Sequence, residues 1–284
     1  MGAVIMLASK YNPKKQKFPV HVSEKYDGVA ADFFKVGRTW QVRSRQNKPI
    51  KSVDHIIRCL NKRLPNAIDG THLVGELYIP GRDFKEISGI VRRDAEAPEV
   101  FLYIYDMYDL ALEHQIFADR FDLLTRVCTN FSPDDPMGIP HYVIADTPED
   151  VERIKSQIIA GDPEAEGLMI RQLNGPGSTY QVGKRPSGMA KYKLVETVDL
   201  EIHSIEEAVD KEGKPKGMLG RLNVLYKGTV IGCGPGKLVH GERYEMFVNQ
   251  EDYIGKTVEV AYMPDASYDA LREPRVLRLR PDKD

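Results

Sequence analysis

The pattern of strand-like and helix-like stretches changes near Glu196, and this change limits the folds that the chain can adopt. Before it, strand-like and helix-like stretches follow one another in no fixed order. After it, short strand-like stretches are separated by Gly, Pro and Lys turns, with one helix-like stretch at 242–249. The first part is typical of an α+β domain and the second of a small β-barrel. For a chain of 284 residues we therefore predict two domains, at 1–195 and 196–284, joined near 195–198.

The strands predicted in each domain follow from their apolar patterns. In the first domain, Val20 and Val22 alternate with His21, Ser23 and Lys25, which indicates a strand with one buried and one polar face. Further strands are predicted there at 32–34, 39–45, 73–79, 100–106, 167–171 and 190–194. The second domain has predicted strands at 200–205, 219–226, 229–232, 257–263 and 275–279, which we interpret as a barrel of the OB type.

Three helices are predicted in the first domain. Ser52 precedes an apolar repeat that runs through Leu60 and is a candidate N-cap. Thr147, followed by Pro148 and by Asp150 at the third helical position, predicts a capping box before a helix that runs through Ile158. The third helix is predicted at 113–128.

Composition excludes several classes of protein. The chain is 42% hydrophobic and 29% charged, which is ordinary for a soluble globular protein. Its first apolar run, 3–8, is shorter than a signal-peptide core, and no segment reaches the length of about 18 apolar residues that a membrane span needs. Three cysteines far apart in sequence favour neither disulfides nor a zinc site. We therefore expect a cytoplasmic protein with no membrane contact.

The charge is nearly balanced, with a formal net charge of -2. A nucleic-acid partner would therefore have to be bound by local basic patches. Two clusters qualify, although each could equally be a solvated loop. One precedes the first strand, and the other surrounds a turn of the second domain: Lys10, Lys14, Lys15 and Lys17, and Lys211, Lys214, Lys216, Arg221 and Lys227.

Short motifs then carry a resemblance to a known family. Lys25-Tyr26-Asp27-Gly28 is a weak signal by itself, but other segments follow it in order: Ser44-Arg45, Gly75-Glu76-Leu77, Tyr105-Asp106, Glu166-Gly167, Lys191-Tyr192-Lys193 and Arg280-Pro281-Asp282-Lys283. Their order and spacing resemble the motifs of ATP-dependent DNA ligases, most of all the minimal phage and bacterial type. The resemblance implies an ATP-grasp-like nucleotidyltransferase domain of antiparallel sheets with helices, followed by an OB-fold domain.

Lys25 is the predicted nucleophile. An amine that forms a bond to phosphorus must be unprotonated, whereas a free lysine has a pKa of about 10.4. Nearby cations lower the pKa of an amine, and Lys191 and Lys193 alternate on one face of a predicted strand, so both could point at the same phosphate. We predict that Lys191 and Lys193 stabilise charge on the α-phosphate. The alternative for this pair is a solvated edge strand.

The resemblance also assigns residues to the nucleotide and the metal. It implies that Ser23 and Glu24 lie in the nucleotide pocket, with Ser23 at the adenine edge, and that Tyr105 stacks on adenine. Glu76 matches the carboxylate that contacts the ribose, and Glu166 the one associated with Mg²⁺ or Mn²⁺; Glu76 is a second candidate ligand. Each of these side chains could otherwise be an ordinary strand or surface residue.

The remaining motif residues are assigned to DNA and to pyrophosphate. Arg45 resembles the arginine that holds the 5′-phosphate of a nick, and Arg43 on the same face competes for this role. Lys214 and Lys216 are candidate DNA contacts. The resemblance implies that the final motif, Arg280, Asp282 and Lys283, orients the leaving pyrophosphate, which requires the second domain to swing about a hinge at 195–198.

Two departures from the family and two alternative functions accompany this interpretation. Ala30 stands where family members usually have an arginine that contacts the ribose, and Val74 where many have Asp. The expected function is an ATP-dependent DNA ligase that seals nicked duplex DNA in repair, replication or recombination, acting as a monomer. One alternative is an RNA ligase, a capping guanylyltransferase or another covalent nucleotidyltransferase. The other is a non-catalytic OB-fold single-strand binder, which the few aromatic residues of the second domain disfavour.

Overall fold

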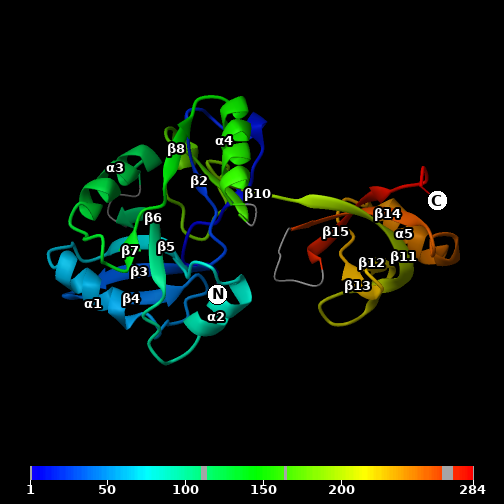
Figure 1. Ribbon diagram of the computed structural model, residues 1–284, viewed down its shortest axis with the longest axis horizontal. Helices are drawn as coiled ribbons and strands as arrows, with labels where there is room; N and C mark the ends of the chain where they lie inside the picture. The colour runs from blue at the N-terminus through cyan, green and yellow to red at the C-terminus, as the bar shows by residue number, and fades with distance from the viewer. Residues whose placement is uncertain (1, 110–113, 163–164, 264–270, 284) are drawn as a thin grey trace. The chain divides into compact units, whose positions relative to one another are not determined.

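The computed structural model describes residues 2–109, 114–162, 165–263 and 271–283. The chain divides into two compact units, Met1–Tyr192 and Lys193–Asp284 (Figure 1). Each unit has its own hydrophobic core. The assignment of residues 1–195 to an adenylation domain and 196–284 to an OB-fold domain stays a prediction.

The N-terminal unit contains two five-stranded sheets, and the first has the strand order β1-β10-β9-β2-β8. Strand β2 pairs antiparallel with both β8 and β9, while β1 pairs parallel with β10. One face of this sheet packs on helix α4, because Val20, Val22, Leu168 and Ile170 turn the same way and are buried with Ile154. The elements are β1 (Ser9–Lys10), β2 (Val20–Glu24), β8 (Tyr142–Ala145), α4 (Pro148–Gly161), β9 (Gly167–Gln172) and β10 (Met189–Lys193).

The second sheet has the order β4-β3-β5-β6-β7. One face forms the largest core with helices α1, α2 and α3, to which Phe33, Leu73, Leu102 and Ile104 contribute. The elements are β3 (Val29–Val36), β4 (Thr39–Ser44), α1 (Asp54–Arg63), β5 (Thr71–Tyr78), α2 (Phe84–Val91), β6 (Phe101–Asp109), α3 (Phe117–Cys128) and β7 (Met137–Gly138). The described residues of this unit also include the short 3-10 turns η1 (Pro13–Lys15) and η3 (Pro176–Ser178).

The helix starts agree with the sequence where the signal is local. The capping box of α4 is confirmed, because Asp150 N donates to Thr147 Oγ1 at 3.2 Å and Thr147 N donates to Asp150 Oδ2 at 3.2 Å. Helix α3 begins at Phe117, later than predicted, and residue 113 of the prediction lies outside the described residues.

The predicted cap of the first helix is wrong. The N-cap residue of α1 is Val53, which makes no side-chain capping bond. Ser52 Oγ instead donates to Val91 O at 2.8 Å, so this hydroxyl ties the start of α1 to the end of α2. Helix α2 itself was not predicted, although Asp83 caps it by accepting a hydrogen bond from Glu86 N at 2.9 Å.

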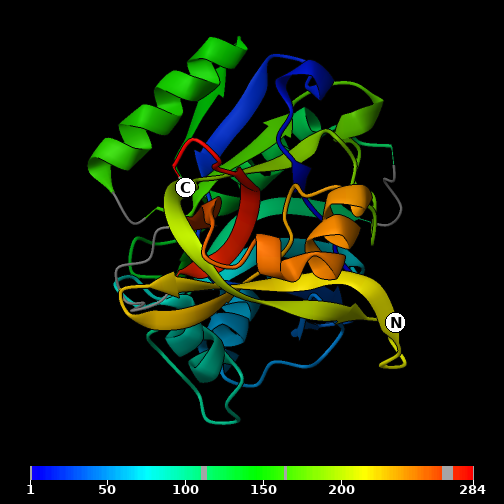
Figure 2. The same cartoon turned by 90° about the vertical axis from the view of Figure 1, so that its right-hand side faces the viewer.

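The C-terminal unit is one five-stranded sheet with a single α-helix among its described residues. The strand order is β13-β12-β11-β14-β15, and β11 and β12 are long and strongly curved (Figure 2). Its elements are β11 (Glu196–Val209), β12 (Pro215–Tyr226), β13 (Thr229–Cys233), α5 (His240–Val248), the 3-10 turn η4 (Gln250–Asp252), β14 (Thr257–Met263) and β15 (Arg272–Leu279). Met246 of α5 packs into the core of this sheet.

The two edges of this sheet approach each other without a continuous ladder. Within the described residues, β13 and β15 are linked by one isolated bridge, in which Gly234 N donates to Pro274 O and Val276 N donates to Gly234 O, each at 3.0 Å. Gly236 follows with a φ of +57°, and a Cβ there would lie 2.0 Å from Val276 O, so only glycine fits. Within the described residues this antiparallel sheet therefore carries one α-helix and is not a closed barrel, so the OB fold is not confirmed.

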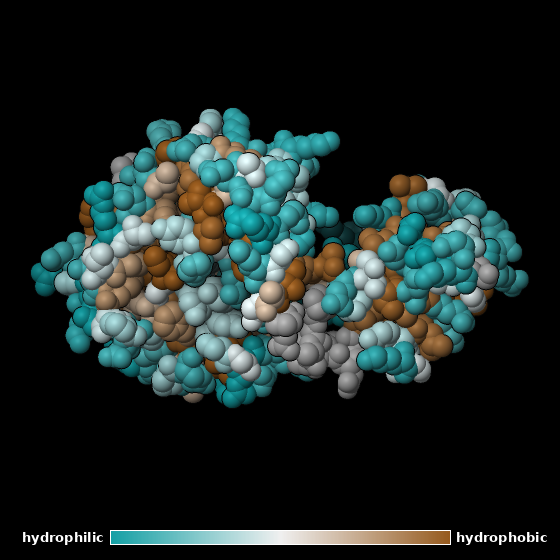
Figure 3. Space-filling view, turned by 45° about the horizontal axis from the view of Figure 1, so that its top comes forward, coloured by the Kyte–Doolittle hydropathy of each residue, from teal (hydrophilic) through white to brown (hydrophobic). Residues whose placement is uncertain are grey.

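The face drawn in Figure 3 is mostly hydrophilic with scattered hydrophobic patches, in line with a mean hydropathy of -0.40. Within the described ranges, no helix is long and apolar enough to cross a membrane.

Candidate active site

Lys25 and Glu166 lie together because of the register between β2 and β9. Glu24 pairs with Leu168, so the residue that ends β2 lies beside the residue that begins β9. Lys25 N donates to Gly167 O at 2.9 Å, and Lys25 Nζ forms an ion pair with the Glu166 carboxylate. The Glu166 side chain is 5% exposed and that of Lys25 is 19% exposed. A charged pair this far from water is held by its own Coulomb attraction.

Glu76 of the second sheet completes a group of charged side chains. Burial raises the pKa of Glu76 to about 8; the neighbouring Lys25 lowers it, whereas Glu166 and Asp27 raise it. These side chains from both sheets therefore share one electrostatic environment. At neutral pH the Glu76 carboxyl holds a proton much of the time, and an arriving cation would displace that proton.

The donor set fits a divalent cation that keeps phosphate and water ligands. No group of three or more His, Cys, Asp or Glu side chains that could hold a metal ion occurs in the described part of the chain. Mg²⁺ is usually bound by one or two carboxylates together with phosphates and waters, so a closed protein cage is not required. Glu166 and Glu76 supply two carboxylates beside Lys25.

Gly28 allows the turn after Lys25 to pack tightly on β5. A Cβ at this position would lie 2.3 Å from Leu77 O and 2.9 Å from Glu76 Cγ, closer than real Cβ contacts. A larger residue would push the turn away from Glu76. The glycine of the Lys25-Tyr26-Asp27-Gly28 motif thus keeps the lysine near the carboxyl group.

Tyr105 lies at an irregularity of β6. Val74 pairs with Asp106 but Gly75 pairs with Ile104, so Tyr105 is the extra residue of a β-bulge, a feature common near binding sites. Its ring is half-buried, as are those of Phe101 and Tyr103, while Leu102 and Ile104 between them are buried in the core. Burial raises the pKa of Tyr105, and Glu76 raises it further. An aromatic wall therefore adjoins the charged group.

A buried ionic network behind Tyr105 was missed by the sequence analysis. Asp106 is fully buried and binds Arg120 through two hydrogen bonds of 2.9 and 3.0 Å, and it also forms an ion pair with Arg171. The guanidinium of Arg171 lies 5.0 Å from the centre of the Tyr105 ring. An arginine directly after the apolar run 168–170 was the available signal. The partner of that arginine could not be found because it is 65 residues away.

The two candidate phosphate-binding arginines have different surroundings. Arg43 binds the buried carboxylate of Asp32 at 2.8 and 2.9 Å, and Asp32 also contacts His72 at 2.8 Å. Arg45 is exposed, and its charge acts on both Glu76 and Tyr105, whose pKa values it lowers.

The remaining predicted nucleotide residues lie close to the charged group in the sheet. Ser23 is buried on β2 opposite Met169, and Glu24 follows it half-buried, with its pKa raised by burial and by Asp162. Ala30 lies directly opposite Glu76 in the β3–β5 ladder. The main chain of Arg45 adjoins Ala30 as well, with Arg45 N donating to Ala30 O at 3.3 Å.

Lys191 and Lys193 both lie on β10, but they belong to different units of the chain. Lys191 is paired with Lys10 of β1, in the N-terminal unit. Lys193 belongs to the C-terminal unit, where its Nζ lies 3.3 Å from Glu273 Oε2. The roles predicted for both at the α-phosphate stay predictions.

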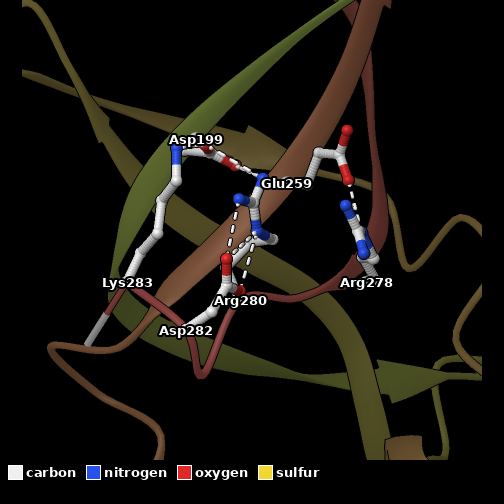
Figure 4. Close-up of polar contacts among 6 residues, drawn as sticks. All are labelled: Asp199, Glu259, Arg278, Arg280, Asp282 and Lys283. Atoms are coloured by element: carbon white, nitrogen blue, oxygen red, sulfur yellow. Dashed lines mark hydrogen bonds and ion pairs between the residues drawn. The ribbon is translucent and has the colours of Figure 1, made fainter.

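The other predicted residues lie in the C-terminal unit. Arg280, Asp282 and Lys283 form one ion-pair cluster with Asp199 (Figure 4). Lys214 and Lys216 are exposed where the β11–β12 hairpin turns, and Lys214 N donates to Asp210 Oδ1 at 2.8 Å. These positions leave the predicted roles in DNA binding and pyrophosphate release untested.

Comparison with known proteins gives the family. The family model of the ATP dependent DNA ligase domain matches residues 5–193, so the chain belongs to this family. The DNA ligase of African swine fever virus is 26% identical over 229 residues, covering 77% of this chain and 53% of the viral protein. The chain spans about half the length of the curated relatives it matches.

Solved structures show the same fold over nearly the whole chain. The structure named Pmar-Lig_Pre has a TM-score of 0.84 at 21% identity and covers 99% of this chain and 68% of its own. A Lig E DNA ligase, described as DNA binding with a minimal scaffold, has a TM-score of 0.74 at 21% identity and covers 97% of this chain and 98% of its own. At such identity the likeness shows the fold alone.

Proposed function

We propose that this protein is an ATP-dependent DNA ligase that seals 5′-phosphate/3′-hydroxyl nicks in duplex DNA. The observation that carries the proposal is the convergence of Lys25, Glu166 and Glu76 from two sheets, beside the Tyr105 wall. Membership of the ATP dependent DNA ligase domain family supports the choice of ATP and DNA.

The reaction proceeds in three displacements, two at the α-phosphorus of ATP and one at the 5′-phosphorus of the nick. The Nζ of Lys25 attacks the α-phosphorus of ATP; a P–N bond forms, the bond to the bridging oxygen breaks, and pyrophosphate leaves with the electron pair while the amine proton passes to solvent. An oxygen of the nick 5′-phosphate then attacks the α-phosphorus; a P–O bond forms, the P–N bond breaks, and the Lys25 amine leaves with the electron pair and takes up a proton. Finally the 3′-hydroxyl attacks the 5′-phosphorus; the phosphodiester bond forms, the bond to the oxygen that bridges to AMP breaks, AMP leaves with the electron pair, and the hydroxyl proton passes to solvent.

Glu166 keeps the nucleophile in place until the nucleotide arrives. The ion pair with Glu166 orients the Lys25 side chain, and its deep position excludes most solvent from the amine. Glu166 and Glu76 would hold Mg²⁺ or Mn²⁺, which supplies positive charge to the phosphate oxygens when bound. Lys191 and Lys193 are the further cations that we propose for the α-phosphate.

The nucleotide pocket and the DNA contacts complete the proposal. Adenine stacks on Tyr105, with Ser23 and Glu24 at its edge and Glu76 at the ribose. Arg45 takes the 5′-phosphate, because its guanidinium is exposed beside the charged group, whereas Arg43 is engaged by Asp32.

The C-terminal unit contributes to the first step and to DNA binding. Lys214 and Lys216 contact the DNA backbone, which makes binding sensitive to salt. Arg280, Asp282 and Lys283 meet the leaving pyrophosphate. We propose an OB fold for this unit on the strength of its strand order and of the bridge between its edges.

A labelling assay tests the proposal. Purified protein is mixed with Mg²⁺ and ATP labelled on the α-phosphate, and then with nicked duplex DNA. The wild type is expected to acquire covalent AMP and to seal the nick, whereas Lys25→Ala does neither. Lys85→Ala, at an exposed position of α2, is the matched control and behaves as wild type. Labelling of the Lys25→Ala protein at the wild-type level would overturn the assignment.

The same assay separates the alternatives. Labelling by GTP in place of ATP would indicate a guanylyltransferase, and sealing of nicked RNA in preference to DNA an RNA ligase. Binding of single-stranded DNA with no labelling by either nucleotide would indicate a non-catalytic binder.

A further inference from the structure

We propose that Asp199 is a positioning residue for enzyme adenylation: it holds Arg280 and Lys283 side by side so that both can receive the leaving pyrophosphate. The inference rests on the proposed function, because the final motif is assigned to pyrophosphate there. It adds a residue that lies 81 positions before Arg280 in the sequence.

The hydrogen bonds of the cluster converge on one carboxylate. Arg280 Nη1 donates to both oxygens of Asp199, at 3.0 and 3.2 Å, and Lys283 Nζ donates to Asp199 Oδ2 at 2.6 Å. On its other side, Arg280 is held by Asp282 through Nε at 3.0 Å and Nη2 at 2.9 Å. Figure 4 shows the guanidinium between these two carboxylates, with Lys283 reaching Asp199 from the far side.

Main-chain hydrogen bonds fix the backbone positions of Arg280 and Lys283 but not the conformations of their side chains. Arg280 N donates to Thr257 O at 2.8 Å, which ties the end of β15 to the sheet, and Lys283 N donates to Arg280 O at 2.9 Å across a tight turn. Lys283 has four rotatable side-chain bonds and a side chain that is 48% exposed. Without a partner, its ammonium group would sample many positions.

Asp199 offsets the repulsion between two cations. An arginine and a lysine that share one acceptor repel each other, and only the carboxylate between them makes their closeness favourable. Asp199 sits on β11 in the middle of the sheet and its side chain is 24% exposed, against 48% for Lys283, so it is more rigidly placed than the lysine. The hydrogen bond from Lys283 holds the pKa of Asp199 below its usual range, so the carboxylate stays charged at neutral pH.

This arrangement suits the leaving group of the first step. As the bond between the α-phosphorus and its bridging oxygen breaks, negative charge develops on pyrophosphate, and two cations already held close together stabilise it without being gathered from solution. Neither cation is needed in this way once AMP is on Lys25. The contribution of Asp199 is therefore confined to adenylation and to its reverse.

The sheet supplies a matched control. Glu259 of β14 is the residue paired with Asp199 across the ladder, and it binds Arg278 at 2.6 Å, not Arg280 or Lys283. Glu259→Ala thus removes a carboxylate and an ion pair from the neighbouring strand while leaving the hydrogen bonds of Arg280 and Lys283 intact.

The test measures three rates for the full chain with Asp199→Ala, Asp199→Asn or Glu259→Ala. These are adenylation by ATP, release of ATP from the AMP-enzyme by added pyrophosphate, and sealing of nicked DNA that already carries 5′-AMP. Asp199→Ala is expected to slow the first two equally, by about 10- to 100-fold, because it removes the carboxylate that accepts charge-assisted hydrogen bonds from both Arg280 and Lys283. Asn, which keeps an acceptor but no charge, falls between. Sealing of adenylated DNA and all three rates of Glu259→Ala stay at the wild-type level.

Several outcomes would overturn the inference. Wild-type or faster adenylation by Asp199→Ala would show that the carboxylate only neutralises the two cations. Equal loss in all three rates, or a lowered Tm that accounts for the loss, would show a merely structural role. Failure of the proposed function is distinct, because the wild type would then acquire no AMP at all.

Discussion

Replacing His21 by phenylalanine should make the protein more resistant to acid. His21 is 4% exposed, and both of its ring nitrogens are buried with no hydrogen-bond partner among the described residues. Its ring packs against Phe117, Phe121 and Tyr142, at centroid distances of 5.4, 4.6 and 4.5 Å. An aromatic ring without nitrogens fits these neighbours, so the substitution removes the titrating group with little change in packing.

The size of the effect follows from the pKa of His21. Burial, reinforced by the positive charge of Arg171, lowers this pKa from 6.5 to about 3. Between these values the unfolded chain binds a proton that the folded protein does not, so the stability falls as the pH drops through 6.5 and stays reduced below 3. Proton linkage therefore lowers the free energy of unfolding, relative to its value at neutral pH, by about 2 kcal/mol at pH 5 and by about 5 kcal/mol below pH 3.

Urea unfolding at pH 7.5 and pH 5 measures this contribution. Other groups titrate in the same range, but they are shared by both proteins and cancel when the wild type is compared with His21→Phe. We expect the wild type to lose about 2 kcal/mol more than the variant between the two pH values. An equal loss in both proteins would mean that His21 is not held neutral by its surroundings, and the packing argument would be refuted.

Three further predictions concern the charged group and its supports. Gly28→Ala is expected to destabilise the fold by about 1–3 kcal/mol and to reduce adenylation, because its Cβ would meet Leu77 O; unchanged urea unfolding and labelling would contradict this. Glu76→Gln removes a group whose pKa is about 8. The adenylation rate of the wild type should therefore rise with pH through this value, whereas that of the variant should not. Parallel pH profiles of the two proteins would show that the charge of Glu76 does not contribute to adenylation. Arg43→Ala removes the cation that binds the buried Asp32, so it should lower the free energy of unfolding by about 3 kcal/mol. Arg45→Ala should impair nick sealing without a change in stability. If Arg45→Ala lost stability and Arg43→Ala lost only sealing, their roles would be exchanged.

The sequence predicts those features that depend on residues near each other in the chain. The capping box at Thr147 is formed as expected, because its partners are three residues apart. The half-buried aromatic face of β6 also follows from simple alternation. By contrast, Ser52 looks like a helix cap in sequence but bonds to Val91, which only the packing of α1 on α2 could reveal.

The candidate site could be predicted as a set of residues but not as an arrangement. Lys25, Glu76 and Glu166 are recognisable from motif order, yet their closeness depends on the register of β2 with β9 and on the packing of the turn after Lys25 against β5. The Arg171–Asp106 ion pair joins residues 65 positions apart, and the β-bulge at Tyr105 has no sequence signature. Long-range pairs of this kind leave no periodic trace in a single sequence.

The central claim is that the amine of Lys25 carries the nucleotide. Digestion of the ATP-treated protein, followed by mass spectrometry of its peptides, locates the attached group directly. We predict a single AMP on the Nζ of Lys25 that disappears when the AMP-enzyme is chased with nicked DNA. AMP attached to any other side chain, or an adduct that nicked DNA does not remove, would contradict the account.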